Sequence, residues 1–122
     1  LSVGYFDEYY IKAQKVRRLI SQDFTEAFAE VDLILTPTTP STAFELDSLI
    51  ADPIKMYQQD LYTVPVNLAG LPAISIPCGF RDRMPLGAQL IAPAFQENLL
   101  LDISMQFQKA TDFHQQFASA FS

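Results

Sequence analysis

The sequence predicts an α/β fold in which long amphipathic helices cover a small mixed sheet. Apolar residues recur every three to four positions over residues 5–31 and again over residues 96–120, as in amphipathic helices. Between these segments lie three short apolar runs with the length of buried strands, at residues 32–36, 73–78 and 86–91. Three strands make a narrow sheet, so we expect further strands of the fold to lie outside this sequence.

The first predicted helix follows Gly4 and contains no proline or glycine. Asp7 and Glu8 stand near its start, where acidic side chains interact favourably with the helix dipole. Its apolar face is formed by Phe6, Tyr9, Ala13, Val16, Ile20, Phe24, Ala27 and Val31. Such a face requires a hydrophobic neighbour, which we expect to be the sheet.

The first strand is expected to end at Thr36–Pro40, where two prolines remove backbone donors and force an extended loop. Residues 41–52 are mixed and polar, and we predict a surface loop. Asp52 and Pro53 are typical of a helix start, as N-cap and first helical residue. A short helix is therefore predicted over residues 53–62.

Pro65 is expected to break this short helix, and a further helical turn ends at Gly70, a natural C-cap residue. Polar residues 81–85 separate the strands predicted at residues 73–78 and 86–91, which indicates a hairpin whose loop is longer than the tightest type. The apolar face of the last predicted helix is formed by Leu100, Ile103, Phe107, Ala110, Phe113, Phe117 and Phe121.

The composition is that of a globular chain and excludes several classes of function. Of the 122 residues, 49% are hydrophobic and 18% are charged. The net charge of −6 disfavours nucleic-acid binding, because a nucleic-acid-binding surface needs clustered Lys and Arg. A single cysteine cannot form an internal disulfide, so we expect a reducing, cytoplasmic compartment. No run approaches the roughly 18 apolar residues of a membrane span. We interpret the densest basic run as a solvated helix face, with contact to a partner protein or to a nucleic acid as the alternative: Lys12, Lys15, Arg17 and Arg18.

Five segments in series resemble the C-terminal part of amidase-signature enzymes, and together they cover essentially the whole chain. Each segment alone is a weak signal, whereas their common order and spacing make the resemblance specific. The segments are Tyr5–Tyr10, Lys12–Ile20, Ile34–Pro40, Val64–Gly79 and Pro85–Ile91.

A narrower similarity, to the A subunit of glutamyl-tRNA(Gln)/aspartyl-tRNA(Asn) amidotransferases, is carried by Tyr5–Arg18, Asp60–Thr63 and Pro77–Gly79. The resemblance implies that residues 1–122 are the C-terminal portion of a single amidase domain. It also implies a glutaminase that hydrolyses glutamine and supplies ammonia to subunits B and C, where ATP and Mg²⁺ support the conversion of Glu-tRNA(Gln) or Asp-tRNA(Asn) to the amidated form. No cofactor is expected on this chain itself.

In that family, catalysis uses a serine nucleophile, a cis-serine and a lysine, which lie with a Gly/Ser-rich loop in the N-terminal half. The present sequence contains no Gly-Gly-Ser-Ser-Gly stretch, so no catalytic residue is assigned here. The chain alone is expected to be inactive, because groups that position a substrate do not replace a nucleophile and its base.

Asp60 is the one residue to which we assign substrate binding. Its position resembles an acidic family residue that pairs with the α-amino group of bound glutamine. A carboxylate suits this role because an ammonium group that leaves water needs a charged partner. The alternative is an ordinary solvated aspartate on a helix.

Other polar residues are interpreted as structural. Cys78 is read as a small buried hydrophobe rather than a nucleophile, and His114 as a half-buried or exposed histidine that lacks the further ligands of a metal site. Gly70 is expected to adopt a positive φ, and Asn67 to tie the adjacent turn through its amide. The loop Thr36–Pro40 follows a strand end and either lines a substrate cavity or is a rigid connector.

Two other functions remain open at this point. One is a stand-alone amide hydrolase of the same family that acts on a small aryl or alkyl amide. The other is a non-catalytic binding or scaffold domain. Copurification with two further subunits favours the amidotransferase, and an upstream reading frame with a Gly/Ser-rich loop excludes the scaffold.

Overall fold

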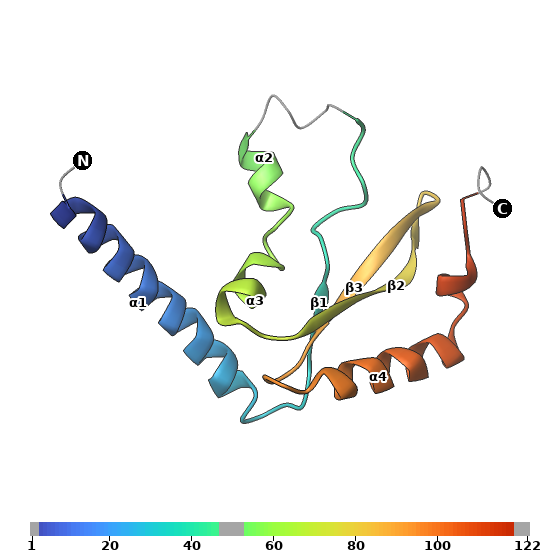
Figure 1. Ribbon diagram of the computed structural model, residues 1–122. Helices are drawn as coiled ribbons and strands as arrows, with labels where there is room; N and C mark the ends of the chain where they lie inside the picture. The colour runs from blue at the N-terminus through green and yellow to red at the C-terminus, as the bar shows by residue number, and fades with distance from the viewer. Residues whose placement is uncertain (1–2, 47–52, 119–122) are drawn as a thin grey trace.

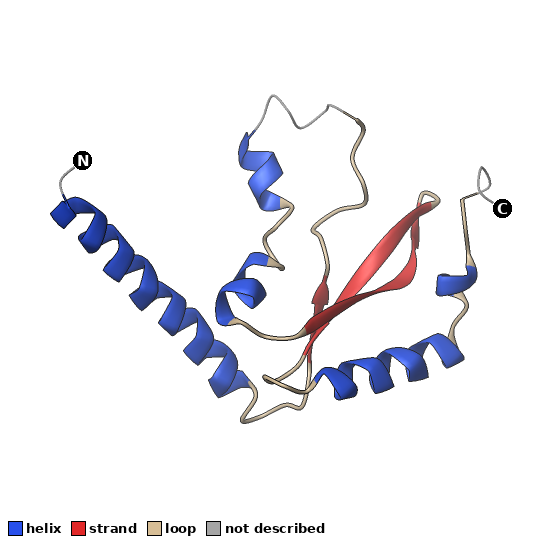
Figure 2. Cartoon of the chain, in the orientation of Figure 1, coloured by secondary structure: helices blue, strands red, loops and turns tan. Residues whose placement is uncertain are grey.

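A computed structural model describes residues 3–46 and 53–118, and Figure 1 shows their arrangement. The chain forms a three-stranded sheet with helices at its side and beneath it (Figures 1 and 2). The elements in chain order are α1 (Val3–Ala27), β1 (Ile34–Pro37), α2 (Pro53–Gln58), α3 (Val64–Ala69), β2 (Ala73–Arg81), β3 (Met84–Ile91), α4 (Glu97–Ala110) and the 3₁₀ turn η1 (Phe113–Gln115). The predicted α/β class and the three predicted strands are confirmed.

The sheet has the order β1-β3-β2, and both pairings are antiparallel. The prediction of a mixed sheet is therefore wrong for the strands that the structure describes. The two outer strands run in the same direction, but β3 lies between them and no parallel pair forms. β2 and β3 are antiparallel because they are joined as a hairpin, and the connection through α2 and α3 places β1 on the far side of β3.

The hairpin is longer and tighter than the sequence predicted. Arg81 pairs with Met84, which leaves a loop of two residues, Asp82 and Arg83, at φ of 51° and 67°. Two left-handed residues match the twist of the strands, so a tight hairpin forms without glycine. The pairing extends this far because the register shifts between Pro77 and Gly79, which accommodates one extra residue in β2.

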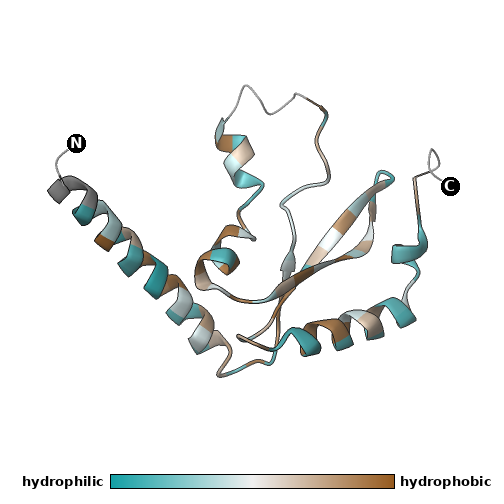
Figure 3. Ribbon diagram, viewed as in Figure 1, coloured by the Kyte–Doolittle hydropathy of each residue, from teal (hydrophilic) through white to brown (hydrophobic). Residues whose placement is uncertain are grey.

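The face of the sheet towards α4 carries a hydrophobic cluster, while Ile91 of β3, which is 1% exposed, is buried on the opposite face. Leu90 of β3 lies opposite Leu35 and Ile74, and these side chains share one face because their positions are in register. Ile74 packs against the cluster, whereas Leu35 on the outer strand β1 is 67% exposed. Helix α4 packs on β2 and completes this core with Leu100 (Figure 1). The buried cluster is formed by Ile76, Leu90, Ala92 and Leu100, flanked by Leu33, Ile74, Ala88, Ile103 and Phe107. Figure 3 shows apolar residues along β2 and β3 and within α4.

Helix α4 ends at Ala110, which corrects the prediction of a helix to residue 120. Thr111 is extended, at φ −138° and ψ 165°, and its Oγ1 donates to the Phe107 carbonyl oxygen at 2.9 Å. The chain then turns back, so that the Phe113 ring lies 6.4 Å from the rings of Phe80 and Phe107. Burial of this ring against the hairpin favours the break over continued helix. Phe121 lies outside the described residues.

Helix α1 is confirmed as a long helix, although it ends at Ala27 and residues 28–30 form a turn. It packs mainly against α3, where Arg17 Nε donates to the Leu68 carbonyl oxygen at 2.7 Å (Figure 1). The expectation that this helix covers the sheet is wrong for the described residues, and Val16 and Leu19 remain 49% and 61% exposed. Within the described chain, no helix is long and apolar enough to cross a bilayer.

The helix predicted over residues 53–62 is shorter than expected, and the separate helical turn predicted before Gly70 is confirmed as α3. α2 stops at Gln58, hydrogen-bonded turns occupy residues 59–63, and α3 begins at Val64. Pro65 is expected to break the helix, and it does so by standing in the first turn of α3, where no backbone donor is needed. The predicted N-cap Asp52 and the rest of residues 47–52 lie outside the described residues.

Candidate functional site

The second face of the sheet is polar at its centre. Gln89 of β3 lies directly opposite Thr36 of β1 and Ser75 of β2. Residues paired in this way point to the same side of the sheet, opposite to Leu90 and the α4 core. The three strands therefore present a row of two hydroxyls and one amide on the face that α4 does not cover.

Gln89 is the buried centre of this polar face, with 5% of its surface exposed. Its Nε2 donates to Thr36 Oγ1 at 3.0 Å and to the Tyr62 carbonyl oxygen at 3.0 Å. A buried amide is stable when its donors find acceptors, and here both donors are used. The amide thereby connects the sheet to the turn between α2 and α3.

A pair of hydroxyls continues the polar face beyond Gln89. Thr38 Oγ1 and Ser75 Oγ lie 2.7 Å apart, so one donates to the other. Gly87 leaves room for this pair, because a Cβ at residue 87 would lie 2.8 Å from Thr38 Oγ1 and 3.0 Å from Ser75 Oγ. Glycine is needed at this position for its small size.

Asp60 lies in the turn between α2 and α3, not on a helix as predicted. Its carbonyl oxygen accepts hydrogen bonds from the backbone N–H groups of Thr63 and Val64 at 3.1 and 3.0 Å. Asp60 is exposed, so its carboxylate is accessible to a ligand. The turn fixes the backbone of Asp60 at the edge of the polar face, because the same turn carries the carbonyl that Gln89 binds.

The loop Thr36–Pro40 lies beside this turn. Thr39 Oγ1 donates to the Ser41 carbonyl oxygen at 2.8 Å, which holds the loop together. Ser41 Oγ lies 3.1 Å from the Thr42 carbonyl oxygen and 3.3 Å from Gln59 Oε1, and its one hydrogen is shared between these two acceptors. The sequence placed this loop at a possible cavity wall. The structure brings the end of this loop next to the turn that carries Asp60, because Ser41, the residue after Pro40, contacts Gln59.

Asn67 and Gly70 have the structural roles that the sequence indicated. Gly70 adopts φ of 71° as the C-cap of α3, and its N–H donates to the Asn67 carbonyl oxygen at 3.2 Å. The Asn67 side chain forms a hydrogen bond, but at the start of α3 and not at the turn that follows it: Nδ2 donates to the Thr63 carbonyl oxygen at 3.0 Å. Asn67 thus stabilises the end of the Asp60 turn.

Cys78 and His114 do not join the polar face. Cys78 is half-buried at the shift in the hairpin register, and its Sγ donates to the Leu86 carbonyl oxygen at 3.5 Å. His114 is half-buried in η1. Over residues 3–46 and 53–118, no group of three or more His, Cys, Asp and Glu side chains is placed to hold a metal ion.

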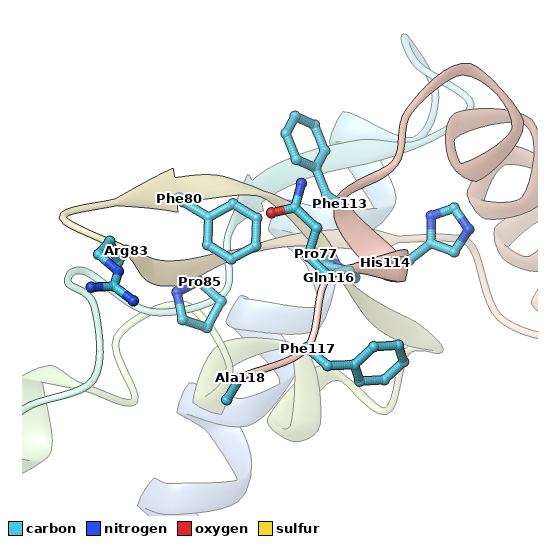
Figure 4. A pocket seen from close by; sticks show the side chains of 9 residues that line it. All are labelled: Pro77, Phe80, Arg83, Pro85, Phe113, His114, Gln116, Phe117 and Ala118. Atoms are coloured by element: carbon cyan, nitrogen blue, oxygen red, sulfur yellow. The ribbon is translucent and has the colours of Figure 1, made fainter. Parts of the chain in front are cut away.

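An open cavity of about 610 Å³ separates the hairpin from the segment after α4 (Figure 4). It is largely apolar and lies at the hairpin tip, away from Asp60. The residues that line it are Pro77, Phe80, Arg83 and Pro85 of the hairpin, with Phe113, His114, Gln116, Phe117 and Ala118.

The basic residues of α1 are all exposed, as a solvated helix face requires. Arg17 has a second role, because its guanidinium binds the C-terminal end of α3 through Leu68. A cation is well placed at a helix C-terminus, where the carbonyl groups lack partners.

Sequence reasoning missed Gln89, which is the best-connected side chain of the site. Its strand reads as an apolar run, and one polar residue in such a run is ordinary. Its partners lie 53 and 27 residues away, so local patterns contain no sign of them. A weak signal was available, since a polar residue between buried neighbours needs a hydrogen-bond partner.

Comparison with known proteins assigns the chain to a family. The amidase family model matches residues 1–101. This chain belongs to the amidase family. The family predicted from the five segments is confirmed.

The relatives of this amidase chain include the A subunits of bacterial glutamyl-tRNA(Gln) amidotransferases. The protein of Coxiella burnetii is 59% identical over 116 residues, which are 95% of this chain and 24% of that protein. The protein of Cellvibrio japonicus is 61% identical over 118 residues, 97% of this chain and 24% of its own length. The chain therefore spans about a quarter of the length of these curated relatives.

Solved structures show the same arrangement. The A subunit of glutamyl-tRNA(Gln) amidotransferase from Thermotoga maritima superposes with a TM-score of 0.74 at 46% identity, covering 80% of this amidase chain and 21% of the other. The S177A allophanate hydrolase of Kluyveromyces lactis superposes with a TM-score of 0.71 at 26% identity. This match covers 93% of the present chain and 18% of the hydrolase. The fold is thus that of amidase-signature enzymes.

Proposed function

We propose that this chain is the C-terminal portion of the glutaminase (A) subunit of a tRNA-dependent amidotransferase, and that it supplies one wall of the glutamine site. Relatives that carry the name of this subunit, at 56–61% identity, support the proposal. The observation that carries the assignment of the wall is the position of Asp60, exposed in a turn that hydrogen bonds hold against the polar face of the sheet.

In this proposal the Asp60 carboxylate pairs with the α-ammonium group of glutamine. The two opposite charges orient the substrate, so that its side-chain amide extends towards the nucleophile. The residues of the polar face are hydroxyls, an amide and a carboxylate, which suit binding and orientation. The serine nucleophile, the cis-serine and the lysine belong to the remainder of the enzyme.

Ammonia released from glutamine then serves subunits B and C in the cytoplasm. There ATP and Mg²⁺ support amidation of Glu-tRNA(Gln) or Asp-tRNA(Asn) for translation. As the family resemblance implies, this proposal places ATP and Mg²⁺ on the other subunits, and no step here is derived through them.

Replacement of Asp60 by alanine in the complete enzyme tests the proposal. We expect the KM for glutamine to rise roughly 30-fold or more, as when one partner of a desolvated charge pair is truncated. We expect kcat to change much less, because the carboxylate does not touch the amide that reacts. Steady-state glutaminase assays measure both constants.

Asp102→Ala is the matched control, since Asp102 is an exposed aspartate of α4 on the other side of the molecule. Asp60→Asn separates charge from shape, and we expect it to resemble Asp60→Ala. Glutamine kinetics that are the same in Asp60→Ala and the wild type would show that Asp60 does not bind the substrate.

A second candidate is a stand-alone amide hydrolase of the same family. The likeness to allophanate hydrolase favours it, because the fold of this segment is shared by an enzyme with a different name and substrate. Hydrolysis of small aryl or alkyl amides by the complete chain without subunits B and C, with glutamine a poor substrate, would establish this function instead.

A further inference from the structure

Two side-chain contacts hold the turn that carries Asp60, one made by a residue before Asp60 in the sequence and one by a residue after it. On one side, Gln59 Oε1 lies 3.3 Å from Ser41 Oγ of the loop after β1, whose single hydrogen is shared with the Thr42 carbonyl oxygen at 3.1 Å. On the other side, the Tyr62 carbonyl oxygen accepts from Gln89 of β3 at 3.0 Å. The second tie is the stronger, because its distance is shorter and Gln89 is buried.

From this geometry we infer that Gln89 is a positioning residue for substrate selection: its buried amide holds the Asp60 turn on the sheet and so fixes where the carboxylate meets the substrate ammonium. The inference rests on the proposed glutamine contact of Asp60. It assigns a role to a residue that does not itself touch the substrate.

The orientation of the Gln89 amide follows from chemistry. A backbone carbonyl can only accept a hydrogen bond, so the amino end of the amide must face Tyr62. The second N–H of the same group then reaches Thr36 Oγ1 at 3.0 Å. Thr36 on β1 thus holds the amide in the rotamer that binds the turn.

Loss of this tie leaves a carbonyl without its partner at the base of the turn. Tyr62 is half-buried, and an acceptor partly shielded from water that loses its donor is costly, so the turn is expected to move until water or another donor reaches Tyr62. Tyr62 is two residues from Asp60, and movement of the turn displaces the carboxylate. A displacement of about 1 Å is enough to weaken a charged hydrogen bond substantially.

The test compares two substrates of the complete enzyme, glutamine and its desamino analogue glutaramate, which has the same reacting amide and no α-amino group. The ratio of their kcat/KM values measures how well the enzyme recognises the ammonium. Gln89→Met keeps the length of the side chain and removes both donors. We expect it to lower this ratio roughly tenfold, through a higher KM for glutamine, while kcat for glutamine stays within about twofold.

Two further variants define the chain of contacts. Thr36→Val removes the hydroxyl and keeps the shape, and we expect a fall in the ratio of about threefold, whereas Thr36→Ser restores the hydroxyl and the wild-type ratio. Gln106→Met is the control for the substitution itself, because Gln106 is an exposed glutamine of α4. Thermal melts verify that each variant is folded.

The outcomes separate the inference from the function on which it rests. An unchanged ratio in Asp60→Ala overturns the ammonium contact and the inference with it. A reduced ratio in Asp60→Ala with an unchanged ratio in Gln89→Met overturns the inference alone, as does an equal loss on both substrates. If Gln89→Met does not fold, Thr36→Val decides, and an unchanged ratio there overturns the inference.

Discussion

The two faces of the small sheet differ in what covers them and in what they do. On one face, Leu90 and Ile76 pack under α4 with Leu100, and the core is apolar. On the other, Gln89 and Ser75 lie one position away on the same two strands, and the face carries hydrogen-bonded polar groups. A shift of one residue along a strand thus separates the side chains packed under α4 from the polar groups next to the Asp60 turn.

The apolar and the polar face fix different parts of the structure. The apolar face fixes the position of the strands, since burial of its side chains drives packing. The polar face then uses the fixed strands as a frame for the Asp60 turn, through Gln89 and Thr36. Changes on the two faces are therefore expected to have different effects on stability and on selectivity.

The largest effect on stability is expected from Leu100→Ala on the apolar face. Leu100 is 3% exposed in the core, so truncation should lower the free energy of unfolding of the complete enzyme by about 3 kcal/mol. Chemical denaturation monitors this change. The ratio of kcat/KM for glutamine over glutaramate should remain that of the wild type.

Leu101→Ala provides the control. Leu101 follows Leu100 on α4 and is 52% exposed, so its truncation should lower the free energy of unfolding by less than about 1 kcal/mol. The comparison of the two faces fails if Leu100→Ala lowers the selectivity ratio as much as Gln89→Met does.

A smaller effect is expected from Gly87→Ala on the polar face. The added Cβ would lie 2.8 Å from Thr38 Oγ1 and 3.1 Å from Thr38 Cβ, and overpacking of this kind costs about 1–3 kcal/mol. Equilibrium unfolding of the complete enzyme gives the value.

A double-mutant cycle with Thr38→Ala tests the cause. In the wild-type background, Thr38→Ala should lower the free energy of unfolding by about 1 kcal/mol, because the hydrogen bond to Ser75 is lost. In the Gly87→Ala background the loss should be smaller, because the substitution also removes the closest clash with the added Cβ. Additive free energies would rule out the steric explanation.

The smallest of these effects is expected from Gly70→Ala, which changes the backbone and neither face. Gly70 has φ of 71° and open space around its missing Cβ, so the cost is conformational and roughly 1 kcal/mol. Gly70→Asn should cost less, because asparagine adopts this conformation more readily. A stability of Gly70→Ala equal to the wild type, measured by thermal melt, would contradict the assigned C-cap role.

Features of the fold that depend on local chemistry were predictable from the sequence. The apolar period indicated α1, the prolines marked the end of β1, and Gly70 marked the end of α3. The tight turn at Asp82 and Arg83 was not predictable, because these residues lack the usual Asn-Gly or Asp-Gly pair. The early end of α4 depends on Phe113 meeting Phe80, a contact made between distant parts of the chain.

The site was predictable in part. Asp60 was singled out through family resemblance, and its contact with the substrate stays a prediction. The wall around Asp60 could not be read from the sequence, because Gln89, Thr36 and Tyr62 meet through strand order and register. Periodicity identifies which residues share a face, but it does not say which strand lies beside which.

A crystal structure of the complete enzyme with glutamine bound, in a form that cannot turn over, tests the central claim most directly. The account predicts a carboxylate oxygen of Asp60 at about 2.8 Å from the α-amino nitrogen of glutamine, with Gln89 still bound to Tyr62. Glutamine bound elsewhere, with Asp60 in contact with solvent alone, would contradict it.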